Sequence, residues 1–339
     1  MVDASVSLKA NITERGAVLL GGHVACDAFD QTMPLRVVTH AHSDHMIGLN
    51  ESLRKCEKVM MTEATKDLID AMMGPHFLMQ GRVETADYGE PVQLGEEKMT
   101  LFPADHILGA AQVLVENSEG MRVAYTGDFR VEDTPVLEAD VLVMEATYGN
   151  PCCKRPFQEE VEGMLTSLVE RGLRQGSVYV FGYHGKLQEV MHILREAGVN
   201  VPFVAPEKVF HVSKVCEQHG MHIGQLTLSD EKEGKEMLNS NSPCVAFYHT
   251  NAKTQIEDGD ALKVNVSGWE FSTPCRRTGE KEFTIALSDH SDFDGLVEYV
   301  RRSKPKLVIT DGFRDGHAET FAKEIRKRFA ILAEALPKS

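Results

Sequence analysis

The sequence lacks the features of several common protein classes. Its 339 residues include seven cysteines, an odd number without a CxxC pair, which argues against a disulfide framework and a cysteine-ligated zinc site. No apolar run is long enough to span a bilayer, and no basic leader precedes a hydrophobic stretch near the N-terminus. We therefore expect a soluble, cytoplasmic protein without membrane partners. A glycine-rich phosphate loop and the Ser-His-Asp or Cys-His patterns of covalent catalysis are also missing.

Positive charge is scarce as well. The formal net charge of −15 counts against a general nucleic-acid coat protein. It does not exclude a nuclease, because a metal centre attracts phosphate locally even on an acidic protein. Basic clusters at 276–277, 301–306 and 326–328 are interpreted as solvated surface in preference to a phosphate track.

Histidine, in contrast, is concentrated in segment 39–45, Thr-His-Ala-His-Ser-Asp-His. The short apolar run before it is rich in β-branched residues and predicts a buried strand. On an extended chain His40 and His42 point to the same side, and Asp44 and His45 follow at the turn. Three imidazoles and a carboxylate supply the nitrogen and oxygen ligands that zinc favours. The segment therefore predicts a metal site.

Other histidine and acidic residues follow predicted strands. The residues at the ends of successive β-rich segments are His40, His106, Asp128 and Glu145. Ligands gather outside the strand ends of open sheets, so four such residues favour a single site. Asp27, one strand ahead of the histidine segment, is either an ordinary turn residue or a residue that orients a metal ligand through a hydrogen bond.

Helices and strands alternate from about residue 157 onward, which predicts βαβ units and a second, mostly parallel sheet. Within this region, the polar stretch 229–242 is predicted to be a surface connection. Residues 283–287 form a predicted strand that leads into Ser-Asp-His290. A final strand at 306–312 contains Asp311 near its end.

These motifs together resemble the metallo-β-lactamase superfamily and its β-CASP nuclease branch. The histidine segment, Asp-His106 before Ile-Leu-Gly, and Thr-Gly-Asp128 follow the order of the superfamily. Glu145-Ala-Thr-Tyr-Gly resembles the acidic motif of the β-CASP branch, and Ser-Asp-His290-Ser-Asp resembles its later histidine motif. Gly-Lys186-Leu-Gln-Glu resembles the element that opens its inserted domain. The resemblance spans nearly the whole chain.

The resemblance implies an α/β fold, an αββα metallo-β-lactamase sandwich of residues 1–175 and 270–339 with an inserted α/β β-CASP domain at 176–269. It implies two zinc ions, with manganese as an alternative metal. The implied ligands are His40, His42 and His106 for one ion and Asp44 and His45 for the other, with Asp128 shared. Glu145 and His290 would handle the proton of the leaving oxygen, and Asp44 would also be catalytic.

The last ligand departs from the family pattern. RNA-cleaving members place a histidine after the final strand, where this chain has Asp311 in Thr-Asp-Gly-Phe. A carboxylate can bind zinc, so Asp311 is the expected ligand of the second ion. His317, six residues further on, is the alternative. DNA-cleaving relatives of the Artemis type have an apolar residue at this position.

The leading hypothesis is a zinc-dependent nuclease that hydrolyses RNA and acts in RNA processing. The alternative is a DNA exonuclease in repair, because Val-Ser-Gly-Trp269 and Leu-Ser-Asp-His290 also resemble ligase-associated exonucleases. An inactive nucleic-acid-binding subunit would be expected to lose ligands that this chain keeps. The inserted domain together with Glu145 disfavours hydrolysis of small molecules. The expected partner is single-stranded RNA or DNA, and a homodimer is compatible with the sequence, which does not determine the oligomeric state.

Overall fold

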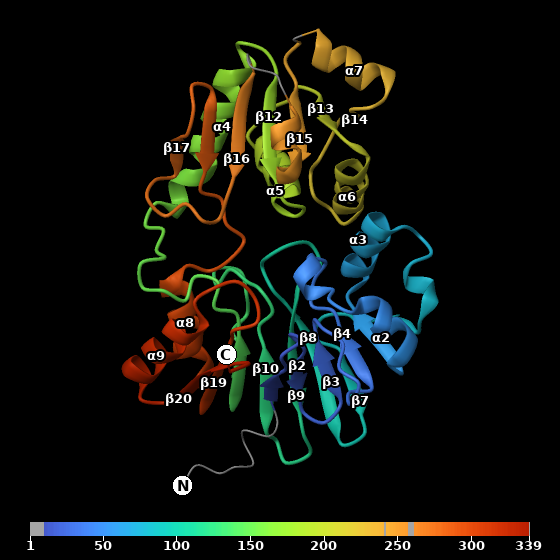
Figure 1. Cartoon of the computed structure of the whole chain (residues 1–339), viewed down its shortest axis with the longest axis vertical. Helices are drawn as coiled ribbons and strands as arrows, with labels where there is room; N and C mark the ends of the chain where they lie inside the picture. The colour runs from blue at the N-terminus through green and yellow to red at the C-terminus, as the bar shows by residue number, and fades with distance from the viewer. Residues whose placement is uncertain (1–9, 241, 257–260, 339) are drawn as a thin grey trace. The chain divides into compact units, whose positions relative to one another are not determined.

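The computed structural model describes residues 10–240, 242–256 and 261–338, and the chain divides into two compact units (Figure 1). Unit 1 comprises residues 1–154 and 289–339, and unit 2 comprises residues 155–288. The sequence placed the domain boundaries after residues 175 and 269. Helix α4 (Val161–Leu173) and strand β18 (Glu282–Ile285) instead belong to unit 2, because their apolar side chains pack into its core.

Unit 1 begins with a six-stranded sheet in which the strands follow chain order. Its strands are β1 (Ala10–Ile12), β2 (Val18–Leu20), β3 (Val24–Cys26), β4 (Leu35–Val37), β5 (Lys58–Met61) and β6 (Val83–Thr85). Between them lie α2 (Leu49–Lys55), α3 (Glu63–Met73) and 3-10 turns at Ser43–His45 and Leu78–Gln80. The hydroxyl of Thr62 caps α3 by accepting from the Thr65 N–H.

A second, seven-stranded sheet of unit 1 has the order β20-β19-β11-β10-β9-β8-β7. Its strands are β7 (Pro91–Leu94), β8 (Glu97–Pro103), β9 (Ala111–Glu116), β10 (Arg122–Tyr125), β11 (Val141–Met144), β19 (Leu307–Asp311) and β20 (Leu332–Leu336). Helices α8 (Phe293–Ser303) and α9 (Ala318–Phe329) flank this sheet (Figure 1).

The two sheets of unit 1 share one apolar core. Val24 and Val37 from the first sheet and Val113 and Val143 from the second belong to the same buried cluster. The opposite face of the second sheet packs against α8 and α9, and α2 packs against β5 of the first. The fold is therefore the predicted αββα sandwich, with a further α/β unit inserted in the chain.

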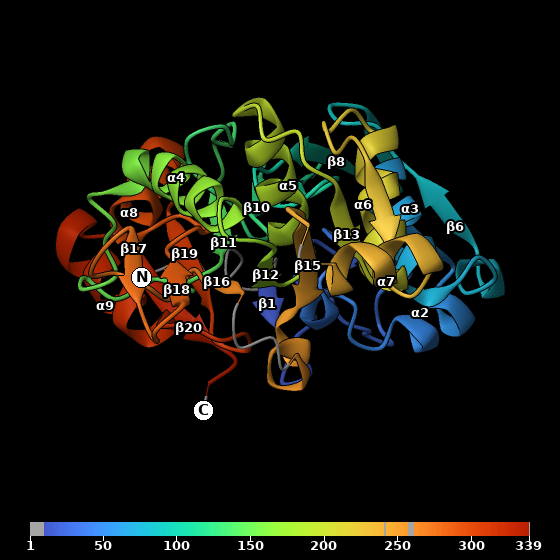
Figure 2. The same ribbon diagram turned by 90° about the horizontal axis from the view of Figure 1, so that it is seen from above.

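Unit 2 is built around a seven-stranded, mostly parallel sheet of order β14-β13-β15-β12-β16-β18-β17. Its remaining strands are β12 (Val178–Gly182), β13 (Phe203–Ala205), β14 (Leu226–Leu228), β15 (Val245–His249), β16 (Leu262–Val266) and β17 (Cys275–Arg277). Its remaining helices are α5 (Lys186–Glu196), α6 (Glu207–Gln218) and α7 (Lys232–Asn239), with 3-10 turns at Gln158–Glu160 and Thr250–Gln255. In Figure 2, α4 and α5 lie along one side of β16, β12 and β15.

Helix α7 corrects one sequence prediction, because stretch 229–242 was expected to be a surface connection. The segment Lys-Glu-Gly-Lys-Glu-Met-Leu-Asn contains mostly strong helix formers. Met237 and Leu238 pack against buried Tyr179 and Phe181 on the sheet of unit 2. Two apolar side chains in a charged segment were thus enough to hold this helix on the sheet.

Strand direction in the second sheet of unit 1 defines the edge that carries the site. Strands β10, β11 and β19 are parallel, and β8 runs in the same direction because both β8 and β10 are antiparallel to β9. The carboxyl ends of these four strands therefore meet at one edge. Among the described residues, no helix has both the length and the apolar character needed to cross a membrane.

Candidate metal centre

Four of the sequence-predicted ligands meet at this edge of unit 1. One nitrogen or oxygen atom from each of His40, His42, His106 and Asp128 lies within 4.8 Å of the others. The ring centroids are 4.9 Å apart for His40 and His42, 4.6 Å for His40 and His106, and 4.9 Å for His42 and His106. Residues separated by almost ninety positions in the chain thus form one compact donor set.

The polar atoms of this cluster are those expected around a cation. His40 Nε2 is buried and makes no hydrogen bond within the described structure. Asp128 Oδ2 lies 3.6 Å from His40 Nε2 and 3.8 Å from His106 Nε2. A buried lone pair without a donor is unfavourable, and a divalent ion bound at His40 Nε2 would remove this cost. Three imidazoles with one carboxylate fit zinc.

The protonation states of His40 and His106 also suit metal binding. Burial, followed by the neighbouring rings of His45 and His106, lowers the pKa of His40 well below its usual value. Burial likewise lowers the pKa of His106 to about 3, although the charge of Asp289 acts in the opposite direction. Both rings are therefore neutral near pH 7, which is the form of imidazole that binds a metal.

Asp27 holds two of these rings in position. Its Oδ2 accepts from His45 Nδ1 and from the Thr39 hydroxyl, each at 2.8 Å, and its Oδ1 accepts from the Thr39 N–H at 2.8 Å. Thr39 Oγ1 in turn lies 3.1 Å from His40 Nδ1. These contacts engage Nδ1 and direct Nε2 of His40 and His45 toward the centre. The backbone of Asp27 is left-handed, with φ of 62°, a conformation that aspartate tolerates better than most residues.

An Asp27→Asn variant is expected to bind metal about 10–100-fold more weakly, because the amide is a poorer acceptor for His45 Nδ1–H. Asparagine also tolerates the left-handed backbone, so the fold should persist. Competition with a chromophoric chelator would measure the affinity. The matched control is Asp30→Asn, since the Asp30 carboxylate bonds to the exposed Thr32. Unchanged metal affinity in Asp27→Asn would contradict the orienting role.

Buried arginines and ion pairs, which the sequence did not reveal, fix the loops that carry the ligands. Arg36 is fully buried, and its guanidinium donates to the carbonyl oxygens of Val37, His45 and Ile47. Arg130 forms a two-pronged ion pair with Asp105, with N–O distances of 2.8 and 2.9 Å. The ion pair between Arg130 and Asp105 joins the loop of His106 to the loop of Asp128.

Gly109 ties the His106 loop to helix α3. Its carbonyl accepts from the hydroxyls of Thr62 and Thr65, at 2.8 and 2.9 Å. Its φ is 78°, and a Cβ at this position would lie 2.6 Å from the Thr65 nitrogen. Only glycine meets both conditions without displacing the helix.

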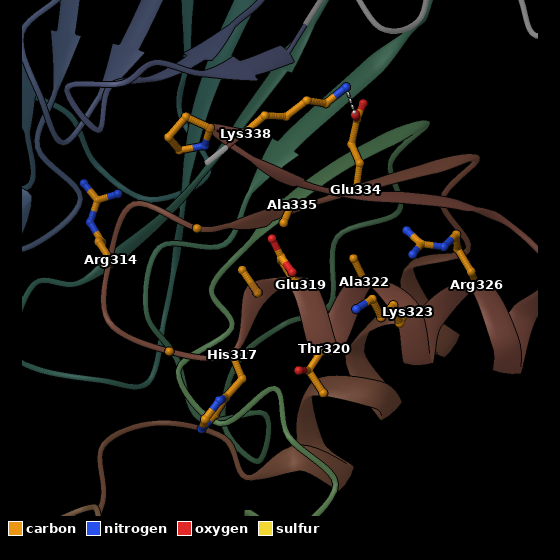
Figure 3. Close-up of a pocket in the computed structure, with 14 residues that line it drawn as sticks. Arg314, His317, Glu319, Thr320, Ala322, Lys323, Arg326, Glu334, Ala335 and Lys338 are labelled. Carbon is orange, nitrogen blue, oxygen red and sulfur yellow. Dashed lines mark ion pairs between the residues drawn. The ribbon is translucent and has the colours of Figure 1, made fainter.

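Of the remaining predicted ligands, two lie beside the centre and two do not. His45 Nε2 lies 3.1 Å from Asp128 Oδ2 and 3.4 Å from Asp44 Oδ2, so Asp44 and His45 are next to the centre. The Asp44 side chain is 55% exposed. Asp311 instead pairs with Arg314, and His317 lines a pocket of about 610 Å³ beside α9 (Figure 3). Within the described residues, neither Asp311 nor His317 belongs to a cluster of potential metal ligands.

Glu145 and His290, the predicted proton-handling pair, are in direct contact. His290 Nδ1 lies 2.9 Å from Glu145 Oε2, and Glu145 Oε1 accepts from the Phe129 N–H at 2.8 Å. The His290 ring is 4.8 Å from that of His106, centroid to centroid. Burial alone would lower the pKa of His290, but the charges of Glu145, Asp128 and Asp289 raise it to about 9. Burial raises the pKa of Glu145, against the effect of His290.

Comparison with known proteins identifies the family in which this combination of a metal-ligand cluster and a Glu–His pair occurs. Residues 30–179 match the family model of the beta-lactamase superfamily domain. An uncharacterized protein in the lig 3′ region of Acidianus ambivalens is 43% identical over 136 residues, which cover 40% of this chain and 97% of that protein. An RNase J-like protein of Methanocaldococcus jannaschii is 23% identical over 398 residues, which cover 94% of this chain and 92% of that one. The chain belongs to the β-CASP nuclease branch of the metallo-β-lactamase superfamily.

Two further proteins resemble this chain, and one of them is much longer. A probable DNA ligase of Opitutus terrae is 28% identical over 303 residues, and these cover 86% of this chain but only 28% of the ligase. A solved structure of a protein of unknown function from Enterococcus faecalis V583 covers 91% of this chain and 81% of its own, with a TM-score of 0.62 and 12% identity. That similarity concerns the overall fold alone.

Proposed function

We propose that the chain is a zinc-dependent nuclease that hydrolyses phosphodiester bonds of RNA. The observation that carries the proposal is the meeting of two groups in unit 1, the four-residue donor set and the Glu145–His290 pair, through His106 and His290. The name of the RNase J-like relative supports RNA as the substrate. Location in the cytoplasm, manganese as the alternative metal and a homodimer stay predictions.

The proposed roles follow from the contacts. His40, His42, His106 and Asp128 would hold an ion, which would supply Lewis acidity toward the phosphodiester and activate water. The exposed carboxylate of Asp44 would accept a proton from the attacking water as its oxygen bonds to phosphorus. His290, whose Nδ1 lies 2.9 Å from Glu145 Oε2, would protonate the leaving oxygen as the bond between that oxygen and phosphorus breaks.

The test uses single-stranded RNA and DNA of one sequence, each end-labelled and matched in length. Metal-loaded protein is expected to cleave the RNA, and chelation should stop cleavage, with zinc or manganese restoring it. Cleavage that survives complete removal of metal would contradict the mechanism. Protein that is loaded with metal and cleaves neither substrate would instead indicate an inactive nucleic-acid-binding subunit.

A DNA exonuclease is the second candidate, because two relatives carry names linked to DNA ligase. One is named for the lig 3′ region, and the other is a probable DNA ligase that contains a region similar to this chain. The same experiment separates the candidates, since cleavage of DNA with sparing of RNA would replace the leading proposal.

A further inference from the structure

Asp311, the expected ligand of a second ion, is engaged within its own turn at the end of β19. Its side chain is only 2% exposed. Oδ1 accepts from the backbone N–H groups of Phe313 and Arg314, at 2.9 and 3.3 Å. Oδ2 accepts from Arg314 Nη1 at 2.5 Å. Coordination of a metal by Asp311 would therefore disrupt a buried ion pair and the turn around it.

Arg314 links this turn to the histidine segment. Its Nη2 donates to the carbonyl oxygens of Gly16 and Asp44, each at 3.3 Å, and its side chain is 8% exposed. In Figure 3 the Arg314 side chain points away from helix α9. The guanidinium thus connects three separate loops of unit 1 beside Asp44, which the resemblance assigns to the second ion.

The charges around Arg314 are those that a second ion would meet. The guanidinium interacts electrostatically with the carboxylates of Asp27, Asp128 and Asp311. Arginine stays protonated in proteins, so its positive charge is permanent. A second ion would face this fixed cation, with Asp44, His45 and the shared Asp128 as its nearby ligands. The fixed positive charge of Arg314, together with the engagement of Asp311, therefore disfavours a second ion at this position.

We propose that Arg314 takes the place of the second ion, so that the chain holds one tightly bound divalent ion at the four-residue donor set. The guanidinium then neutralises the carboxylate side of the centre and fixes the backbone of Asp44. Arg314 is a positioning residue, and Asp311 positions Arg314 instead of a metal. The inference rests on the proposed metal centre but is independent of the choice between RNA and DNA.

The experiment is a titration of the full-length chain with zinc, in which bound metal is counted by mass spectrometry after exchange into metal-free buffer. The native chain is expected to retain one ion. Asp311→Asn is expected to retain one ion as well, because Asp311 contacts Arg314 and not the metal. Arg314→Met should bind a second ion when zinc is in excess, because it loses the fixed cation and releases Asp311. Excess zinc should then raise its melting temperature more than that of the native chain.

The matched control is Arg326→Met, since Arg326 lines the same pocket as Arg314 but donates to the Ala333 carbonyl on β20. It should behave as the native chain does. Two tightly held ions in the native chain, or loss of an ion in Asp311→Asn, would overturn the inference. The metal content of the native chain and of Asp311→Asn tests the inference even if Arg314→Met does not fold. A native chain that retains no metal would overturn the inference and the proposed function together, whereas two ions would leave the proposed function intact.

Discussion

An Asp128→Asn variant is expected to lose its bound metal and to hydrolyse nucleic acid at least about 10³-fold more slowly. The Asp128 carboxylate is buried, and its Oδ2 faces the Nε2 atoms of His40, His45 and His106. Lewis-acid catalysis by a divalent ion supplies several kcal/mol of transition-state stabilisation, and each 1.4 kcal/mol corresponds to about tenfold in rate. The asparagine amide is a weak metal ligand, but it can donate to these imidazoles, so the fold should be retained.

The matched control for this variant is Asp140→Asn. Asp140 precedes β11, at the end of the strand opposite to Glu145, where it accepts from the Arg122 N–H and pairs with Lys306. Metal content measured by mass spectrometry and cleavage of labelled oligonucleotides should both be unchanged in this control. An Asp128→Asn protein with full metal content and native activity would exclude Asp128 from the centre.

Replacing His290 by glutamine is expected to reduce the cleavage rate by about 10²–10⁴-fold without releasing the metal. His290 lies outside the four-residue donor set, but its ring is adjacent to that of His106. Glutamine cannot carry the transferable proton. The exposed His76, in the loop after α3, provides the control, since His76→Gln makes the same substitution at a position far from His290 in the sequence. Loss of metal together with activity would instead make His290 a ligand.

The pH dependence of the reaction tests the same pair from another direction. The pKa of His290 is raised to about 9, so the protonated ring is present below this pH and is lost as the pH rises through it. Activity should therefore fall on the alkaline side. Glu145→Gln removes the anion that contributes most to this rise, so the pKa should fall toward the ordinary value of about 6.5 and the alkaline limb should move to lower pH. An alkaline limb at the same pH in both proteins would rule out His290 as the proton donor.

Much of this architecture could be predicted from the sequence because its signals are local. Helices α8 and α9 have clear apolar periodicity, and the histidine segment directly follows a β-branched strand. The strand-end rule then predicts that His106, Asp128 and Glu145 lie together. Family relatives confirm the branch and the nuclease class that these motifs indicated.

The contacts that orient the site are not local, and they could not be predicted in the same way. Arg314 meets Gly16 and Asp44, which lie about three hundred positions away in the sequence, and Arg36 bonds only to backbone carbonyls in the contacts described above. Such pairs leave no periodic pattern. The assignment of α4 to unit 2 similarly depends on packing between its apolar face and β12, which a boundary based on composition does not detect.

Unit 1 consists of two segments that are separated in the chain by unit 2, and this order has a consequence for protein synthesis. The chain leaves this unit after Lys154 and returns at Asp289, one residue before His290. A ribosome that has completed unit 2 has therefore already produced all four proposed metal ligands, but neither the proposed proton donor His290 nor strand β19, which pairs with β11. Until β19 emerges, the edge of the apolar strand β11 lacks its partner and is prone to pairing with other chains. The proposed active site is therefore complete only after the last segment of unit 1 has been synthesised, and until then the nascent chain depends on protection of that edge.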